Sequence, residues 1–191
     1  MTITLIRHAP VIARWDVRLR IDELPRWIET YDTAPIDTTP PDRVLFEIAA
    51  RARWVVASGL KRTTDSLAVL GITPDETDPL FDEASVPSGS IGWLRLRPMQ
   101  WLTYFRLRAL VGGVLPRSGL RRLAQRADTA ADRLIARAEE HDDVLLMGHG
   151  AINHFIGKSL IKKGWRRIEG GGTKNWGFTT YYTPPGDERS R

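Results

Sequence analysis

Three short apolar runs, each followed by a segment with helical spacing, constrain the fold of this chain most. The runs cover residues 2–6, 54–58 and 143–147, and apolar residues fill most of their positions. Strands this apolar are buried on both faces, which is typical of parallel sheets covered by helices. The sequence therefore predicts an α/β fold: a three-layer sandwich with a mainly parallel central sheet and helices on both faces.

The remaining segments divide into helices, one further strand and loops. Apolar residues recur at helical spacing in residues 42–51, 60–70, 93–111, 118–141 and 151–163, and Gly71 follows the second of these helices. A shorter extended segment is expected at 79–83 and a final strand at 176–183. Five prolines predict that residues 9–41 form a long irregular excursion with at most short helical pieces, and clustered glycines predict loops at 87–92 and 162–172.

Residues 93–111 combine aromatic side chains with four arginines. An apolar stripe at helical spacing normally faces the interior, so the simplest interpretation is a helix that covers the core. Two alternatives stay open: a cap or lid inserted at about 93–117 that closes over a substrate, and a surface that forms a homodimer.

Composition excludes several kinds of site and suggests a compartment. The chain has 191 residues and no cysteine, which excludes disulfides, thiolate zinc sites and cysteine nucleophiles. A run of about 20 uncharged apolar residues, as a membrane span needs, is absent, and the first residues do not form a secretory signal. We therefore expect a cytoplasmic protein of one domain without a membrane partner.

The formal charge of +5 is compatible with an anionic partner. In a nucleic-acid-binding protein, basic residues commonly alternate with stacking aromatics along one element, whereas the arginines here are spread over the whole chain. Nucleic-acid binding is therefore the weakest of the functions considered, and a solvated basic surface is the simpler interpretation.

Polar residues follow each of the three apolar runs. They are Arg7 and His8 after the first, residues 58–62 after the second, and Gly148-His149-Gly150 after the third. Ligands of open parallel sheets bind beyond the carboxyl ends of the strands, so these groups are expected to converge. Two guanidiniums offer planar forks of donors to phosphate oxygens, and a neutral imidazole is a nucleophile for phosphorus. The expected substrate is a phosphate ester, and His8 is the expected nucleophile.

At these positions the sequence resembles the histidine phosphatase superfamily, which has a phosphoglycerate mutase-like fold. The family opens with a strand ending Leu-Ile-Arg-His-Gly, carries Ser-x-Leu-x-Arg-x-x-x-Ser/Thr after its second strand, and places a second His followed by Gly after a late strand. The matching blocks here are Leu5-Ile6-Arg7-His8-Ala9, the segment from Ser58 through Arg62 to Ser66, and Gly148-His149-Gly150. The resemblance implies a single domain over residues 1–191.

The resemblance also implies a role for each matched residue. His8 is phosphorylated on a ring nitrogen, while Arg7, Arg62 and His149 hold the phosphoryl oxygens and stabilise charge during transfer. The leaving group takes a proton from a carboxylic acid, for which Glu83 is the best match and Asp82 the alternative. Water then hydrolyses the phosphohistidine.

This chain departs from the family pattern directly after the nucleophile. Ala9 replaces the usual glycine, although its carbonyl can still orient the imidazole of His8. The following residues lack polar phosphate contacts, which leaves Arg14, Arg18 and Arg20 as replacements or as an ordinary basic loop.

We therefore expect a cofactor-independent phosphomonoesterase without a metal, acting on a phosphorylated small molecule or a phosphoprotein. No His or carboxylate spacing typical of zinc and no phosphate-binding glycine loop is present in the sequence. The alternatives are a phosphate-binding or scaffold protein of the same fold that has lost activity, and a phosphomutase, which the short chain disfavours.

Overall fold

The computed structural model describes residues 1–84, 93–110, 117–172 and 174–184, and of residues 106–110, 117 and 118 the backbone only. Short 3-10 turns, η1 and η2, separate some of the helices and strands. In chain order the elements are β1 (Thr2–Arg7), η1 (Ile21–Glu23), α1 (Leu24–Thr33), α2 (Arg43–Arg51), β2 (Trp54–Ala57), α3 (Lys61–Val69), β3 (Glu76–Thr77), η2 (Pro79–Phe81), α4 (Pro98–Leu110), α5 (Arg117–His141), β4 (Asp143–Gly148), α6 (Gly150–Lys162), β5 (Arg166–Gly170) and β6 (Phe178–Tyr182).

The strands of the described residues form one mixed sheet in the order β3-β2-β4-β1-β6-β5. β1, β2, β3 and β4 run parallel, whereas β6 pairs antiparallel with β1, and β5 pairs antiparallel with β6. The register places Arg7 beside Gly148 and Ala57 beside Met147, so β1, β2 and β4 end at one edge. This arrangement brings the three predicted polar segments together.

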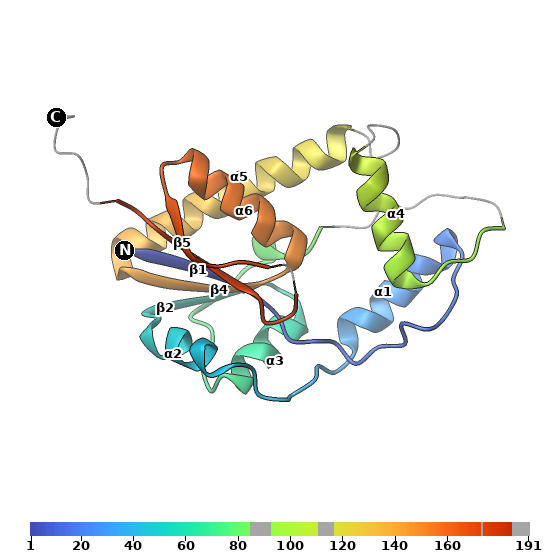
Figure 1. Ribbon diagram of the computed structural model, residues 1–191, viewed down its shortest axis with the longest axis horizontal. Helices are drawn as coiled ribbons and strands as arrows, with labels where there is room; N and C mark the ends of the chain where they lie inside the picture. Colours follow the sequence, from blue (N-terminus) through green and yellow to red (C-terminus); the bar gives the residue numbers. More distant parts are fainter. Residues whose placement is uncertain (85–92, 111–116, 173, 185–191) are drawn as a thin grey trace.

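Helices cover both faces of the sheet, as the sequence predicts (Figure 1). Side chains of β4 alternate between two clusters because successive residues of a strand point to opposite faces. Val144 and Leu146 pack with α5 and α6, whereas Leu145 and Met147 pack with α2 and α3. These buried apolar clusters confirm the three-layer sandwich.

A separate cluster joins α1 and α4, which lie together beyond one end of the sheet (Figure 1). Trp101 is fully buried and Phe105 nearly so, and both pack with Ile21 and Leu24. The helix predicted at 93–111 begins only at Pro98, since Leu96 forms a backbone bridge with Leu19. The apolar stripe of α4 therefore covers the N-terminal excursion and not the sheet.

Three predicted segments need correction. Residues 9–41 contain a ten-residue helix, α1, because Pro25 lies in its first turn, where no intrahelical N–H is needed. Residues 79–81 form a 3-10 turn, and the short strand lies just before it at β3. The predicted loop at 162–172 contains β5, an edge strand exposed along its whole length and held by its pairing with β6.

The loop predicted at 87–92 lies outside the described residues. Every described helix is too short or too polar to cross a membrane.

Candidate active site

His8 lies directly beyond β1 and is 2% exposed. Its Nδ1 lies 2.6 Å from the carbonyl oxygen of Ala9, and since a carbonyl only accepts, Nδ1 carries the proton and Nε2 keeps its lone pair. Burial and the positive charges of Arg62 and Arg7 lower the pKa of His8 to about 3, although the hydrogen bond to Ala9 opposes this shift. The imidazole is therefore neutral at physiological pH.

Ala9 is held at both ends of its backbone. Its N–H donates to Oγ of Ser66 on α3 (2.9 Å), and its carbonyl also accepts from Nδ2 of Asn175 (3.0 Å). Asn175 donates in addition to the carbonyl of His8 (2.8 Å). Ala9 is not among the non-glycine residues of the described chain that have positive φ, so alanine fits where the family has glycine.

The sequence alone did not indicate a role for Asn175, because its hydrogen-bond acceptors, the carbonyls of His8 and Ala9, are far away in the chain. Replacing it by alanine removes both hydrogen bonds and should lower the free energy of unfolding by ~1–2 kcal/mol. Urea unfolding followed by circular dichroism measures this loss. The neighbouring exposed Lys174 supplies the control, since Lys174→Ala should leave the free energy of unfolding nearly unchanged, and an equal loss in both variants would contradict the role of Asn175.

Arg62 reaches the site from the first turn of α3, with its side chain 4% exposed. Its Nε donates to Nδ1 of His149 (3.3 Å), and its Nη1 donates to Oδ1 of Asp32 on α1 (2.6 Å). The ring of Tyr31 covers one face of the guanidinium at 5.1 Å. Two hydrogen bonds and an aromatic ring therefore fix its orientation.

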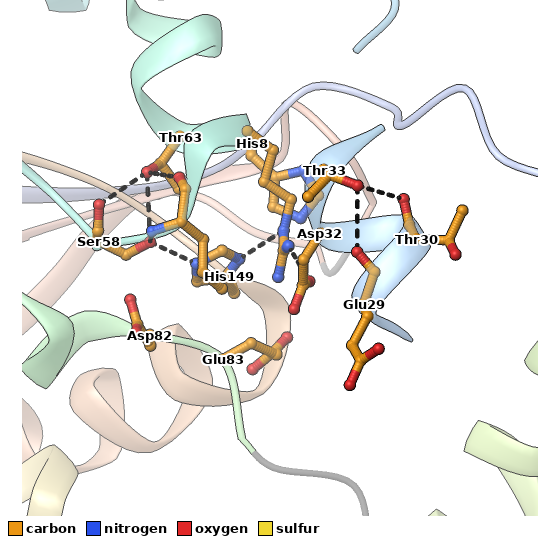
Figure 2. A network of polar contacts seen from close by, with 12 residues as sticks. His8, Glu29, Thr30, Asp32, Thr33, Ser58, Thr63, Asp82, Glu83 and His149 are labelled. Atoms are coloured by element: carbon orange, nitrogen blue, oxygen red, sulfur yellow. Dashed lines mark hydrogen bonds and ion pairs between the residues drawn. The ribbon is translucent and has the colours of Figure 1, made fainter. Parts of the chain in front are cut away.

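His149 is the fully buried N-cap residue of α6. Because its Nδ1 accepts from Arg62, its Nε2 carries the proton and donates to Oγ of Ser58 (2.7 Å). Burial foremost, and then the charge of Arg62, lower the pKa of His149. The rings of His149 and His8 meet edge to face with centroids 5.1 Å apart (Figure 2). Two neutral imidazoles are therefore in edge-to-face contact at this site.

Arg7 lies beside the first residue of α6. A Cβ added to Gly150 would lie 3.6 Å from Nη1 of Arg7, and the charge of Arg7 helps lower the pKa values of both buried histidines. The absence of a side chain at Gly148 lets Asn153 pack against its backbone, since a Cβ there would lie 2.4 Å from Oδ1 of Asn153. The two arginines and two histidines named by the sequence therefore converge on one site.

The two candidate acids, Asp82 and Glu83, lie on the same side of His149 (Figure 2). Glu83 accepts hydrogen bonds from the backbone N–H groups of Ala151 (3.3 Å) and Ile152 (3.2 Å) in the first turn of α6. Oδ1 of Asp82 accepts from the N–H of Gly59 (2.7 Å). Burial raises the pKa of Asp82, and the hydrogen bond from Gly59 opposes that shift.

Two of the three arginines proposed as replacement phosphate contacts have other partners. Arg14 and Arg20 form ion pairs with Asp16 and Asp22, and Arg18 is exposed. Among the described residues, no group of histidines and carboxylates could hold a metal ion. Sequence reasoning missed Tyr31 and Asp32, because the proline-rich excursion gave no sign that a helix would carry them to Arg62.

Solved structures resemble this chain over most of its length, whereas no protein-family model and no curated protein matches the sequence. A mycobacterial glucosyl-3-phosphoglycerate phosphatase in complex with VO3 is 16% identical, covering 94% of this chain and 90% of its own, with a TM-score of 0.53. The Entamoeba histolytica phosphoserine phosphatase in complex with 3-phosphoglyceric acid is 14% identical, covering 94% and 89%, with a TM-score of 0.51. Mycobacterial hydrolase 2 is 18% identical, covering 99% and 86%, with a TM-score of 0.51. Likeness at such low identity shows the fold alone, and this chain has the phosphoglycerate mutase-like fold.

Proposed function

We propose that this protein is a phosphomonoester hydrolase that needs no cofactor and works through a phosphohistidine at Nε2 of His8. The orientation of His8 is the observation that carries the proposal, because the hydrogen bond to Ala9 leaves Nε2 as the unprotonated nitrogen. Two of the similar solved structures are phosphatases, one for glucosyl-3-phosphoglycerate and one for phosphoserine, and they support a phosphatase. The substrate is a phosphorylated small molecule or a phosphoprotein.

In the first step, the lone pair of His8 Nε2 attacks phosphorus and the bond from phosphorus to the ester oxygen breaks. Arg7 and Arg62 balance the charge of the phosphoryl oxygens, and the fork of Arg62 suits two of them. In the structure, Nη1 of Arg62 holds Asp32 and the Nε2 proton of His149 is directed at Ser58. A phosphoryl oxygen that takes either of these hydrogens therefore replaces the internal acceptor, Asp32 or Ser58.

The departing ester oxygen takes a proton from a carboxylic acid. Glu83 is the proposed donor, with its carboxyl at the start of α6, and Asp82 is the alternative. The raised pKa of Asp82 favours the protonated form that a donor needs, so both residues require testing.

In the second step, water attacks the phosphohistidine, the N–P bond breaks and inorganic phosphate forms. The carboxylate that gave up its proton takes one from the attacking water, which returns the site to its starting state. His8 regains the neutral form that its lowered pKa favours.

The test is a panel of phosphomonoesters, sugar phosphates and phosphopeptides incubated with the purified protein, with inorganic phosphate measured. Release of phosphate from at least one class is expected. Arg62→Lys keeps the charge but loses the planar fork, so kcat/KM should fall by about one to two powers of ten, equivalent to ~1.5–3 kcal/mol.

Lys61→Ala is the matched control for Arg62→Lys. Lys61 is next in sequence, mostly exposed, and pairs with Asp65 on the surface of α3. Its replacement should leave kcat/KM nearly unchanged. Full activity of Arg62→Lys, or a larger loss in Lys61→Ala, would contradict the proposed role of Arg62, and absence of phosphate release from every ester would contradict the proposed function.

A further inference from the structure

The carboxylate of Asp32 already accepts a hydrogen bond from Arg62, the arginine whose guanidinium is proposed to hold phosphate. Oδ1 of Asp32 accepts from Nη1 of Arg62 at 2.6 Å, and the side chain of Asp32 is 33% exposed. Asp32 lies in the last turn of α1, and earlier residues of this helix, Leu24, Trp27 and Ile28, pack with α4 away from the sheet. The ion pair thus links the α1–α4 cluster to the candidate active site.

We propose that Asp32 competes with phosphate for Arg62 and thereby promotes release of inorganic phosphate after each turnover. This inference rests on the proposed function, because it assigns Asp32 a role at the same phosphate-binding arginine. A carboxylate and a phosphoryl group present paired oxygens of similar spacing to a guanidinium, so one can take the place of the other.

Arg62 has little freedom to bind the carboxylate of Asp32 and a phosphate group at the same time. Its Nε is engaged by His149, the ring of Tyr31 covers one face, and the side chain is almost fully buried. A phosphoryl oxygen that takes the Nη1 hydrogen now bound to Asp32 displaces this carboxylate, and an oxygen bound at another N–H of the guanidinium lies next to a negative charge. Either outcome weakens the binding of phosphate.

After phosphate displaces it, the carboxylate of Asp32 can be solvated by water and can return to Arg62. One third of the Asp32 side chain is exposed, so water can solvate the carboxylate once it leaves Arg62. Since α1 keeps it nearby, its effective concentration at Arg62 stays high, and it can return as phosphate dissociates. Asp32 thus weakens binding of the substrate phosphate group in return for faster loss of the product.

Isothermal titration of the protein with inorganic phosphate tests this competition directly. Asp32→Asn keeps an oxygen that can accept from Nη1 but removes the charge, so phosphate should bind about tenfold more tightly. The inhibition constant of phosphate during turnover should fall by a similar factor. Asp32→Ala, which removes the acceptor altogether, should change both constants in the same direction.

Glu29→Gln is the matched control because it removes the same charge from the same helix. Glu29 is exposed, and its replacement should change the dissociation constant of phosphate by less than about twofold. Equal or weaker phosphate binding by the folded Asp32 variants, or equal tightening in Glu29→Gln, would overturn the inference.

The two proposals can fail separately. Hydrolysis by the wild-type protein without tightening in the Asp32 variants would overturn only the competition. Tightening without hydrolysis of any ester would overturn only the phosphatase. A wild-type protein and variants that all fail to bind phosphate would overturn the phosphate site and the competition together.

Discussion

In His8→Ala, the rate of hydrolysis of every ester that the wild-type protein cleaves should fall by at least ~10⁴-fold, because the variant lacks the Nε2 atom that is proposed to attack phosphorus. The wild-type protein, quenched within one turnover of a labelled substrate, should carry label that is lost in acid and kept in base. Rapid quench with ³²P-labelled substrate, followed by acid or base treatment, measures both properties.

His154→Ala provides the control for His8→Ala. His154 is an exposed residue on α6, and its replacement should leave both hydrolysis and labelling unchanged. Label that survives acid but not base, or label retained in the His8→Ala protein, would contradict a phosphohistidine at this position. Circular dichroism of His8→Ala separates loss of the nucleophile from loss of the fold.

Glu83→Gln should slow esters with poor leaving groups by ~10²–10⁴-fold and aryl phosphates much less, since an aryl oxide leaves without a proton. The ratio of kcat/KM for an alkyl phosphate to that for an aryl phosphate measures the effect. This ratio isolates proton donation, because a disturbed phosphate site would slow both substrates alike.

Asp82→Asn decides between the two acids. The variant keeps an oxygen that can accept from Gly59, so the connection after β2 should remain intact. If Glu83 is the donor, Asp82→Asn should leave the ratio of alkyl to aryl cleavage nearly unchanged. An equal loss for both substrates in Glu83→Gln, together with a changed ratio in Asp82→Asn, would move the role to Asp82.

The convergence of Arg7, His8, Arg62 and His149 could be predicted because it depends on local patterns. Each lies at the end of a strand or shortly after it, the apolar sequence of the strand marks it as buried, and parallel strands end at the same edge. The orientation of His8 could also be anticipated, since its partner is the adjacent carbonyl of Ala9.

The parts that could not be predicted depend on contacts between distant segments. Helix α1 lies among prolines, and its contacts are with distant residues: Leu24 shares a buried cluster with Trp101, and Asp32 pairs with Arg62. β5 has no apolar alternation, because its two faces are exposed and backbone hydrogen bonds to β6 hold it. Asn175 donates to the carbonyls of His8 and Ala9 across separations of 167 and 166 residues, which no local pattern reveals.

The position of β1 between β4 and β6 makes assembly of the nucleophile a late event in folding. Thr2 pairs with Tyr182, so the first of the described strands pairs with the last of them. Closing so long a loop costs entropy before any contact compensates it, and contacts of this kind slow folding. On the ribosome, residues 2–8 must therefore wait for nearly the entire domain to emerge, which leaves an unpaired apolar strand edge exposed for most of synthesis.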